Sequence, residues 1–412
     1  MDRSICMEVP VQKGVRRHDI DWLRVILFGL LIPFHVAIGV YWSTYGTEVN
    51  PNIDEIVAED RKEFVEESND YTAESVDFTS MVLHWLHSFR LGSLFMISGL
   101  GTAFAFKRRT WHKFLEERIK RLLVPMLFGA WTMGFACSVI LGNEDMSPAG
   151  LAFGFLWGVV WRSLVFWIPI FGKLIGISWL WYLWNLFQYS LILTPIFHIV
   201  RESPDGKMAS FLRSPFRIPM GIGPLVVMPL ILTMTEVVFK PWFPGYIGVA
   251  YEWFWFLVFF AFGYMCIIAK EEYYAFMESK RITITALTAL WTVAFVWLRL
   301  EQHHSGVPYV DGGWLENGII HDRMTLVACA IHSFHAWFWC LTIFSWAAYL
   351  LNRPSEILAY LNRAVYPFYI VHMPLTFAGL RVASEVGLRD YSAVFVATAF
   401  VVLFCWVFFE GV

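Results

Sequence analysis

A chain of 412 residues that is 58% hydrophobic and only 16% charged is too apolar for a soluble protein, in which about a quarter of the residues carry a charge. Its net charge of -3 is small, and we expect no nucleic-acid partner. The six cysteines show no CxxC pair and no metal-ligand spacing, so we predict neither a disulfide framework nor a metal site. Hydrophobic residues come in blocks of about 20, the length of a membrane-spanning helix. The composition therefore predicts an all-α polytopic membrane protein, with residues 1–412 forming one membrane-embedded domain.

About ten apolar stretches are long enough to span the bilayer. In chain order they cover residues 22–44, 80–106, 122–142, 178–200, 221–239, 250–269, 282–300, 323–350, 364–383 and 391–409. A further apolar segment, residues 149–175, is interrupted by polar and helix-breaking residues, namely Arg162, Pro169, Gly172, Lys173 and Gly176. We expect this segment to be interfacial on the outer side, or to be re-entrant and return to that side.

The charges of the loops predict the orientation, because basic residues accumulate on the cytoplasmic side. Residues 107–121 carry seven basic and two acidic side chains, whereas residues 45–79 carry eleven acidic and two basic ones. We therefore predict that 107–121 is cytoplasmic and that 45–79 is an acidic extracytoplasmic loop. The basic segment 201–217 is also cytoplasmic only if residues 149–175 do not cross the membrane. This topology places both termini in the cytoplasm.

The first apolar stretch carries two ionisable residues, Arg24 and His35, which are eleven positions apart. Eleven residues make about three helical turns, so the two side chains share a face and lie about 16 Å apart along the axis. If the stretch spans the bilayer, Arg24 lies at the cytoplasmic headgroups and His35 near the midplane. An ionisable residue at that depth is costly and marks a candidate functional site.

The second and third stretches add further polar groups. Arg90 lies well inside the second stretch, and Ser98 and Gly99 follow it, small enough for a backbone or a ligand to approach closely. Arg118 and Arg121 precede the third stretch and share one helix face. They suit phosphate binding, although basic residues at this position also serve simply as membrane anchors.

The later stretches carry histidines at a comparable depth. His332 and His335 lie in the eighth stretch, and Tyr366 and His372 lie in the ninth. His372 is expected about 12 Å from the cytoplasmic end, close in depth to His35. One intramembrane histidine is often a packing residue. Several on different helices at one depth favour a shared polar cavity.

These motifs together resemble the membrane-bound acyltransferase type 3 family, in particular its branch that succinylates periplasmic glucans. The family has a basic residue, ten intervening residues and a histidine in its first span, as at Arg24 and His35. It also has an Arg-x-x-Arg pair before its third span, as at Arg118 and Arg121, followed by a proline. The segments LFMISGLG, WLWYLWNLFQY and YPFYIVHMP are similar to its second, fourth and late spans.

The resemblance implies transfer of an acyl group from cytoplasmic acyl-coenzyme A, either acetyl- or succinyl-coenzyme A, to a hydroxyl of an extracytoplasmic glycan such as a periplasmic glucan. His35 would then act as the general base or as the nucleophile. The oxyanion would be stabilised by Arg90, Tyr366 or His372.

The same resemblance assigns the donor site. Arg24, Arg118 and Arg121 would hold the phosphates of the coenzyme at the cytoplasmic side. Ser98 lies where the chain leaves room for the coenzyme to approach. No metal cofactor is expected.

The competing hypothesis is a membrane transporter or flippase for a lipid-linked sugar or a small solute, in which the buried arginines and histidines form a substrate or proton pathway. The two halves of the chain show no matching pair of Gly- or Pro-broken helices, the usual sign of inverted repeats. We expect a multi-pass protein surrounded by lipid in the inner membrane of a bacterium. The sequence leaves open the acyl group, the acceptor and the oligomeric state, a homodimer included.

Overall fold

The computed structural model describes residues 17–45, 78–107, 109–142, 147–165, 178–240, 251–305 and 323–411. Within these ranges the chain forms helices joined by turns, and no strand occurs. The fold is therefore all-α, as the sequence predicts. The predicted acidic loop, residues 45–79, lies almost entirely outside the described residues.

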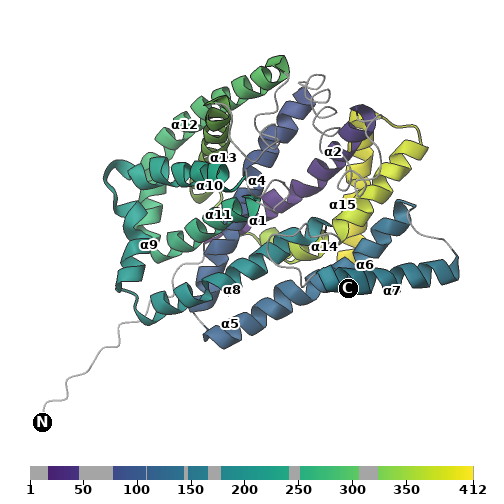
Figure 1. The fold of residues 1–412 in the computed structure, drawn as a ribbon, viewed down its shortest axis with the longest axis horizontal. Helices are drawn as coiled ribbons and strands as arrows, with labels where there is room; N and C mark the ends of the chain where they lie inside the picture. The colour runs from purple at the N-terminus through teal and green to yellow at the C-terminus, as the bar shows by residue number, and fades with distance from the viewer. Residues whose placement is uncertain are drawn as a thin grey trace, which may run out of the picture.

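α4 lies near the middle of the molecule, and helices from both halves of the chain pack against it (Figure 1). In chain order the helices are α1 (Asp19–Gly29), α2 (Leu31–Tyr45), α4 (Phe78–Lys107), α5 (Trp111–Arg118), η1 (Ile119–Leu123), α6 (Val124–Ile140), α7 (Pro148–Val165), η2 (Ser178–Leu180), α8 (Trp181–Glu202), α9 (Lys207–Arg217), η3 (Pro219–Gly221), η4 (Gly223–Val227), α10 (Met228–Phe239), α11 (Tyr251–Ile268), α12 (Lys270–Ser305), α13 (Arg323–Leu350), α14 (Glu356–Glu385) and α15 (Asp390–Gly411).

Nine helical segments in the described part of the chain are long and apolar enough to cross a membrane. They correspond to all the predicted spans except 364–383. That range is helical too and forms part of α14, a 30-residue helix that is not among the nine. The first part of segment 149–175 forms α7, which is not among the nine and projects at one edge of the molecule (Figure 1). Residues 166–177 lie outside the described part.

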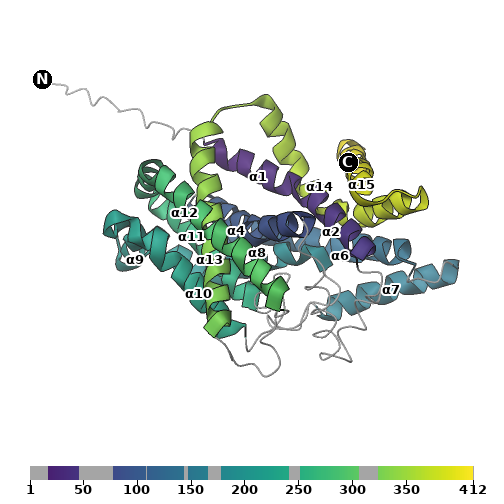
Figure 2. The ribbon, with the colours of Figure 1, turned by 90° about the horizontal axis from the view of Figure 1, so that it is seen from above.

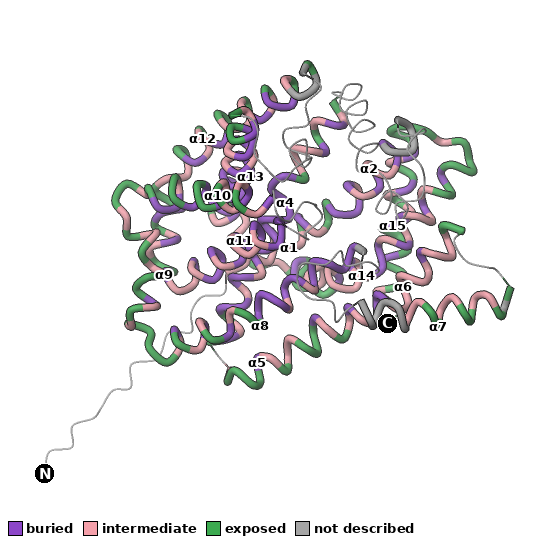
Figure 3. Tube along the Cα trace, in the orientation of Figure 1, coloured by how far each residue is buried: buried purple, intermediate pink, exposed green. Residues whose placement is uncertain are grey.

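The most buried part of the molecule surrounds α4 and α11, whereas α5, α7 and α9 are more exposed (Figure 3). Glycines let α4 and α11 cross at very short range. A Cβ atom on Gly99 would lie 2.0 Å from the carbonyl oxygen of Phe260, and one on Gly263 would lie 2.1 Å from that of Met96. Small residues allow such close backbone contact between membrane helices. The close approach predicted at Gly99 is therefore made by the backbone of α11.

A proline explains why the first span is interrupted. Pro33 has no N–H group to donate to the carbonyl of Gly29, so the regular helical hydrogen-bond pattern cannot continue there. α1 ends at Gly29, and α2 begins at Leu31 (Figure 2). Arg24 and His35 therefore lie on two successive helices and not on one uninterrupted helix.

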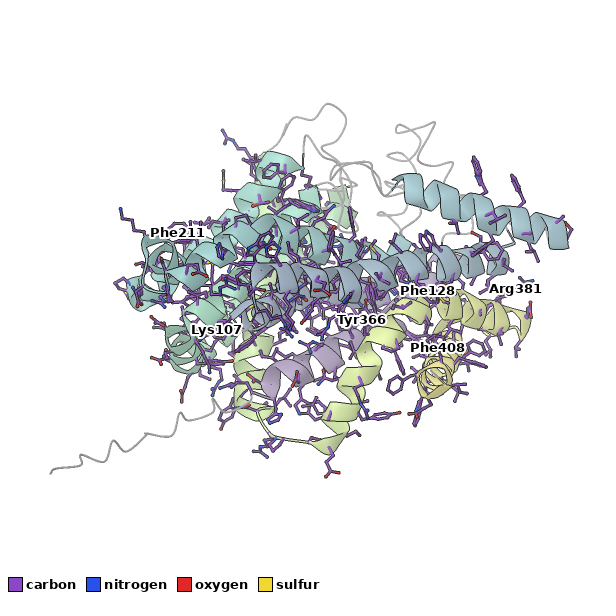
Figure 4. All side chains as sticks on the ribbon, turned by 90° about the horizontal axis from the view of Figure 1, so that it is seen from below. Lys107, Phe128, Phe211, Tyr366, Arg381 and Phe408 are labelled. Carbon is purple, nitrogen blue, oxygen red and sulfur yellow. The ribbon has the colours of Figure 1, made fainter. Side chains whose placement is uncertain are left out.

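The periphery carries many exposed hydrophobic side chains, as expected for a surface in contact with lipid. Phe128, Phe211 and Phe408 are examples from three different helices (Figure 4). His35, Arg90 and His372 lie instead on α2, α4 and α14, respectively.

Candidate functional site

The centre of the site is a pair of histidines on different helices. The Nδ1 atom of His35 on α2 lies 3.0 Å from the Nε2 atom of His372 on α14. The planes of the two rings are nearly parallel, with centroids 5.1 Å apart and an interplanar angle of 11°. His372 is fully buried. The structure thus brings together the two histidines that the sequence places at similar depth.

The hydrogen bonds around this pair define its tautomers. The Nδ1 atom of His372 lies 2.7 Å from the carbonyl oxygen of Tyr369, which can only accept, so this nitrogen carries the proton. In the neutral ring Nε2 of His372 is then an acceptor, and Nδ1 of His35 must donate to it. The proton-free nitrogen of a neutral His35 is therefore Nε2. Among the described residues this atom has no hydrogen-bond partner.

A proline and a tryptophan fix the helix that carries His372. Pro374 lacks an N–H group, which leaves the carbonyl of Ile370 without its helical partner. The indole Nε1 of Trp179 donates to that carbonyl at 3.2 Å. In return, the hydroxyl of Tyr369 donates to the carbonyl of Trp179. These reciprocal bonds join η2 to α14 beside the histidine pair.

Arg90 on α4 brings a buried positive charge to the same place. Its side chain is 1% exposed, and its guanidinium carbon lies 4.1 Å from the ring centroid of Phe34, the neighbour of His35. The guanidinium interacts electrostatically with both His35 and His372. Its Nε and Nη1 atoms are buried and have no hydrogen-bond partner among the described residues. A buried charge of this kind is costly unless something pairs with it.

Ser98 and Arg24 lie around Tyr182 of α8. The hydroxyl of Tyr182 donates to the carbonyl of Leu94 at 3.1 Å and accepts from the hydroxyl of Ser98 at 2.7 Å. Arg24 is partly exposed, lies 3.6 Å from Asp21 and interacts electrostatically with Tyr182. The hydroxyl of Ser98 is thus engaged between α4 and α8, whereas Arg24 retains access to solvent.

Arg118 and Arg121 form a separate cationic site at the end of α5 and in η1. Arg118 lies over the ring of Phe114, at 4.7 Å from its centroid, and interacts electrostatically with both Arg121 and Arg109. Within the described ranges, no hydrogen bond or ion pair involves the guanidinium of Arg118 or of Arg121. The carboxylate of Glu117 also interacts with Arg118 and offsets part of this repulsion. Neighbouring guanidinium groups that repel one another are suited to an anionic ligand such as phosphate.

Tyr366 connects this cationic site to the helix of the histidine pair. Pro125 frees the carbonyl of Arg121 from its helical bond, and the Tyr366 hydroxyl donates to it at 2.6 Å. The structure thus places Tyr366 with Arg121. Tyr366 and His372 are six residues apart, about 9 Å along α14. α14 therefore carries both ends of the candidate site.

A buried polar network on α10 and α13 joins His332, which the sequence indicated, to Glu236 and Lys240, which it did not. Glu236 is fully buried, and its carboxylate lies 3.1 Å from Lys240 Nζ and 3.0 Å from His332 Nδ1. The sequence signal was a carboxylate within an apolar span, four residues before a lysine. In the part of the chain that the structure describes, no group of three or more His, Cys, Asp or Glu side chains is placed to hold a metal ion.

Comparisons with known proteins agree with the motifs. The family model Acyl_transf_3, described as an acyltransferase domain, matches residues 17–410. Similar proteins include the glucans biosynthesis protein C of several Escherichia coli strains. Each is 22% identical over 379 residues, which cover 89% of this chain and 83% of the relative. No solved structure matches this chain.

Proposed function

Because this chain belongs to the acyltransferase 3 family and is a multi-pass membrane acyltransferase, we propose that it moves an acetyl or succinyl group from cytoplasmic acyl-coenzyme A to a hydroxyl of an extracytoplasmic glycan. A periplasmic glucan is the favoured acceptor, since the similar proteins carry the name glucans biosynthesis protein C. This proposal includes the inner membrane of a bacterium as the location, with both termini in the cytoplasm.

The observation that carries the proposal is the free Nε2 atom of His35, oriented by the bond from Nδ1 to His372. As general base, this nitrogen takes the proton of the acceptor hydroxyl while the hydroxyl oxygen attacks the thioester carbonyl. The tetrahedral intermediate then breaks its C–S bond, and the proton passes from His35 to the departing thiolate. The products are an ester and free coenzyme A, so protons and electrons balance.

Arg90 supports this chemistry in one of two ways. Its guanidinium, of which Nε and Nη1 have no partner among the described residues, can stabilise the oxyanion that forms from the thioester carbonyl. It can also pair with the free carboxylate of a succinyl group. The second role explains why a full positive charge is retained where no described side chain neutralises it, and it favours succinyl- over acetyl-coenzyme A.

The cationic end of the site, at Arg118 and Arg121, suits the phosphates of the donor. Arg118 and Arg121 have guanidinium groups with no hydrogen bond or ion pair among the described residues, and Arg24 is partly exposed in the chain's first span. The link from Arg121 through Tyr366 to α14 relates this end to the histidine pair. A coenzyme bound by its phosphates here can extend its thioester toward His35.

The test is the binding of acetyl- and succinyl-coenzyme A to the detergent-purified protein, measured as thermal stabilisation. A ligand at about 100 times its Kd stabilises the folded state by about 2.7 kcal/mol. We expect this stabilisation in the wild type and its loss in the double variant Arg118→Ala/Arg121→Ala. Lys120→Ala, in the same segment, is the matched control and should keep it. Absence of stabilisation by either coenzyme, in a folded wild-type protein, would contradict the proposed donor and favour the transporter hypothesis.

A further inference from the structure

A pocket of about 470 Å³ lies where α4 ends and α5 begins, and its volume is within the usual range for small-molecule sites. It is lined by Phe104, Ala105, Arg109, Lys113 and Glu117. These residues were not among the candidates that the sequence indicated. We call this site the α4–α5 pocket.

The charged groups of the α4–α5 pocket are only partly neutralised. The Nε atom of Arg109 donates to Glu117 at 2.6 Å, and its Nη1 atom donates to the carbonyl of Ala105 at 3.3 Å. Lys113 is exposed, and within the described ranges no side chain forms a hydrogen bond with its ammonium group. Arg109 is thus held in place by Glu117, while Lys113 remains available for an anion.

An aromatic ring and a carboxylate give the pocket features that a simple phosphate site does not need. Phe104 is 44% exposed, so one face of its ring can stack against a purine base. Glu117 can accept a hydrogen bond from an exocyclic amino group. This combination fits a nucleotide better than a free phosphate or a lipid headgroup.

The α4–α5 pocket is next to the Arg118 site. Arg109 interacts electrostatically with Arg118, and Glu117 directly precedes Arg118 in the chain. A ligand with phosphates in both places would extend from the α4–α5 pocket past Arg118 and Arg121. Coenzyme A has this shape, with an adenosine 3′-phosphate at one end, a pyrophosphate next to it and the thiol arm beyond.

We propose that the α4–α5 pocket binds the adenosine 3′-phosphate end of the donor coenzyme, an inference that rests on the proposed function. Phe104 stacks on the adenine, Glu117 accepts a hydrogen bond from the adenine amino group, and Lys113 binds the 3′-phosphate. The pyrophosphate is left for Arg118 and Arg121. The pocket thereby contributes affinity for the nucleotide part of the donor, whatever acyl group the donor carries.

The experiment measures the Kd of coenzyme A and of dephospho-coenzyme A, which lacks the 3′-phosphate, by titration calorimetry on the detergent-purified full chain. The wild type should prefer coenzyme A, and Lys113→Gln should weaken coenzyme A binding by about fivefold, the upper range for an exposed charge pair. Lys113→Gln should leave the Kd of dephospho-coenzyme A unchanged. Lys120→Gln is the control, because Lys120 is exposed on the same segment and pairs with Glu116.

A second variant tests the stacking contact. Phe104→Leu keeps an apolar side chain but removes the aromatic face. It should weaken the binding of both coenzyme A and adenosine 3′,5′-bisphosphate. Equal binding of coenzyme A by wild type and Lys113→Gln would overturn the α4–α5 pocket as the nucleotide site. The assignment would also be overturned if Lys113→Gln weakened only the binding of anionic lipid in nanodiscs.

The failure of this inference is distinguishable from failure of the proposed function. If coenzyme A binds and its acyl derivative is consumed, but neither Lys113→Gln nor Phe104→Leu alters the Kd, only the pocket assignment is wrong. If the wild type binds no form of coenzyme A, both are wrong. If adenosine 3′,5′-bisphosphate binds through Lys113 and Phe104 but no acyl group is transferred, the pocket assignment stands and the proposed reaction does not.

Discussion

Two replacements of His372 test whether this residue orients the ring of His35 or only packs against it. His372→Phe keeps a planar ring of similar size on α14 but removes the acceptor that lies 3.0 Å from His35 Nδ1. The imidazole of His35 is then free to carry its proton on either nitrogen, and the tautomer with a proton on Nε2 cannot act as a base. His372→Gln retains a carbonyl oxygen that can accept from His35 Nδ1.

The magnitude follows from the contribution of a positioned general base, which is typically about 10²- to 10⁴-fold in rate. We expect His372→Phe to lower kcat within that range, or by ~2.7–5.4 kcal/mol of activation free energy. His372→Gln should stay within about tenfold of the wild type. The assay is release of free thiol from succinyl- and acetyl-coenzyme A in the presence of a glucan acceptor. KM for the donor and the thermal unfolding midpoint should change little in both variants.

The comparison between the two variants decides the interpretation. If His372→Phe and His372→Gln lose the same amount of activity, the acceptor atom is not what matters at this position. If His372→Phe retains the wild-type rate in a folded protein, His372 does not orient the base, and the tautomer argument is wrong.

Three further predictions concern Arg90, the α4–α11 contact and the buried network. Arg90→Gln should reduce the preference for succinyl- over acetyl-coenzyme A by roughly 1.5–3 kcal/mol, the value of a charged hydrogen bond; an unchanged ratio would exclude the carboxylate contact. Gly99→Ala should destabilise the fold by about 1–3 kcal/mol. Gly101→Ala, for which no described residue has an atom within 4 Å of the added Cβ, should be neutral in thermal unfolding. Glu236→Gln breaks the buried pair with Lys240 and should cost about 3–5 kcal/mol of stability; an unchanged unfolding midpoint would refute that.

The histidine pair shows which features of the site can be predicted from the sequence and which cannot. Counting residues along apolar stretches was enough to put His35 and His372 at similar depth, because the helical rise fixes depth along each span. Their hydrogen bond and tautomers depend on how α2 packs against α14. The prediction that Arg24 and His35 share one helix face assumed an uninterrupted helix, whereas the chain forms two successive helices, α1 and α2, there.

Other parts of the site depend on contacts that no local pattern encodes. Pro125 and Pro374 are visible in the sequence, but the partners of the carbonyls that they free, Tyr366 and Trp179, come from distant segments. The buried position of Glu236 likewise became evident only from α10 packing against α13. Composition, span length and the Arg-x-x-Arg spacing are local properties, so they could be identified from the sequence alone.

The most direct test of the account is the rate of acyl transfer by His35→Gln in lipid nanodiscs, measured beside donor binding. Gln keeps a side chain of similar reach that can hydrogen-bond His372 but cannot accept a proton at neutral pH. We predict a loss of about 10²- to 10⁴-fold in kcat, with the Kd of the acyl-coenzyme A donor unchanged. A folded His35→Gln protein that transfers the acyl group at the wild-type rate would contradict the assignment of His35 as the base.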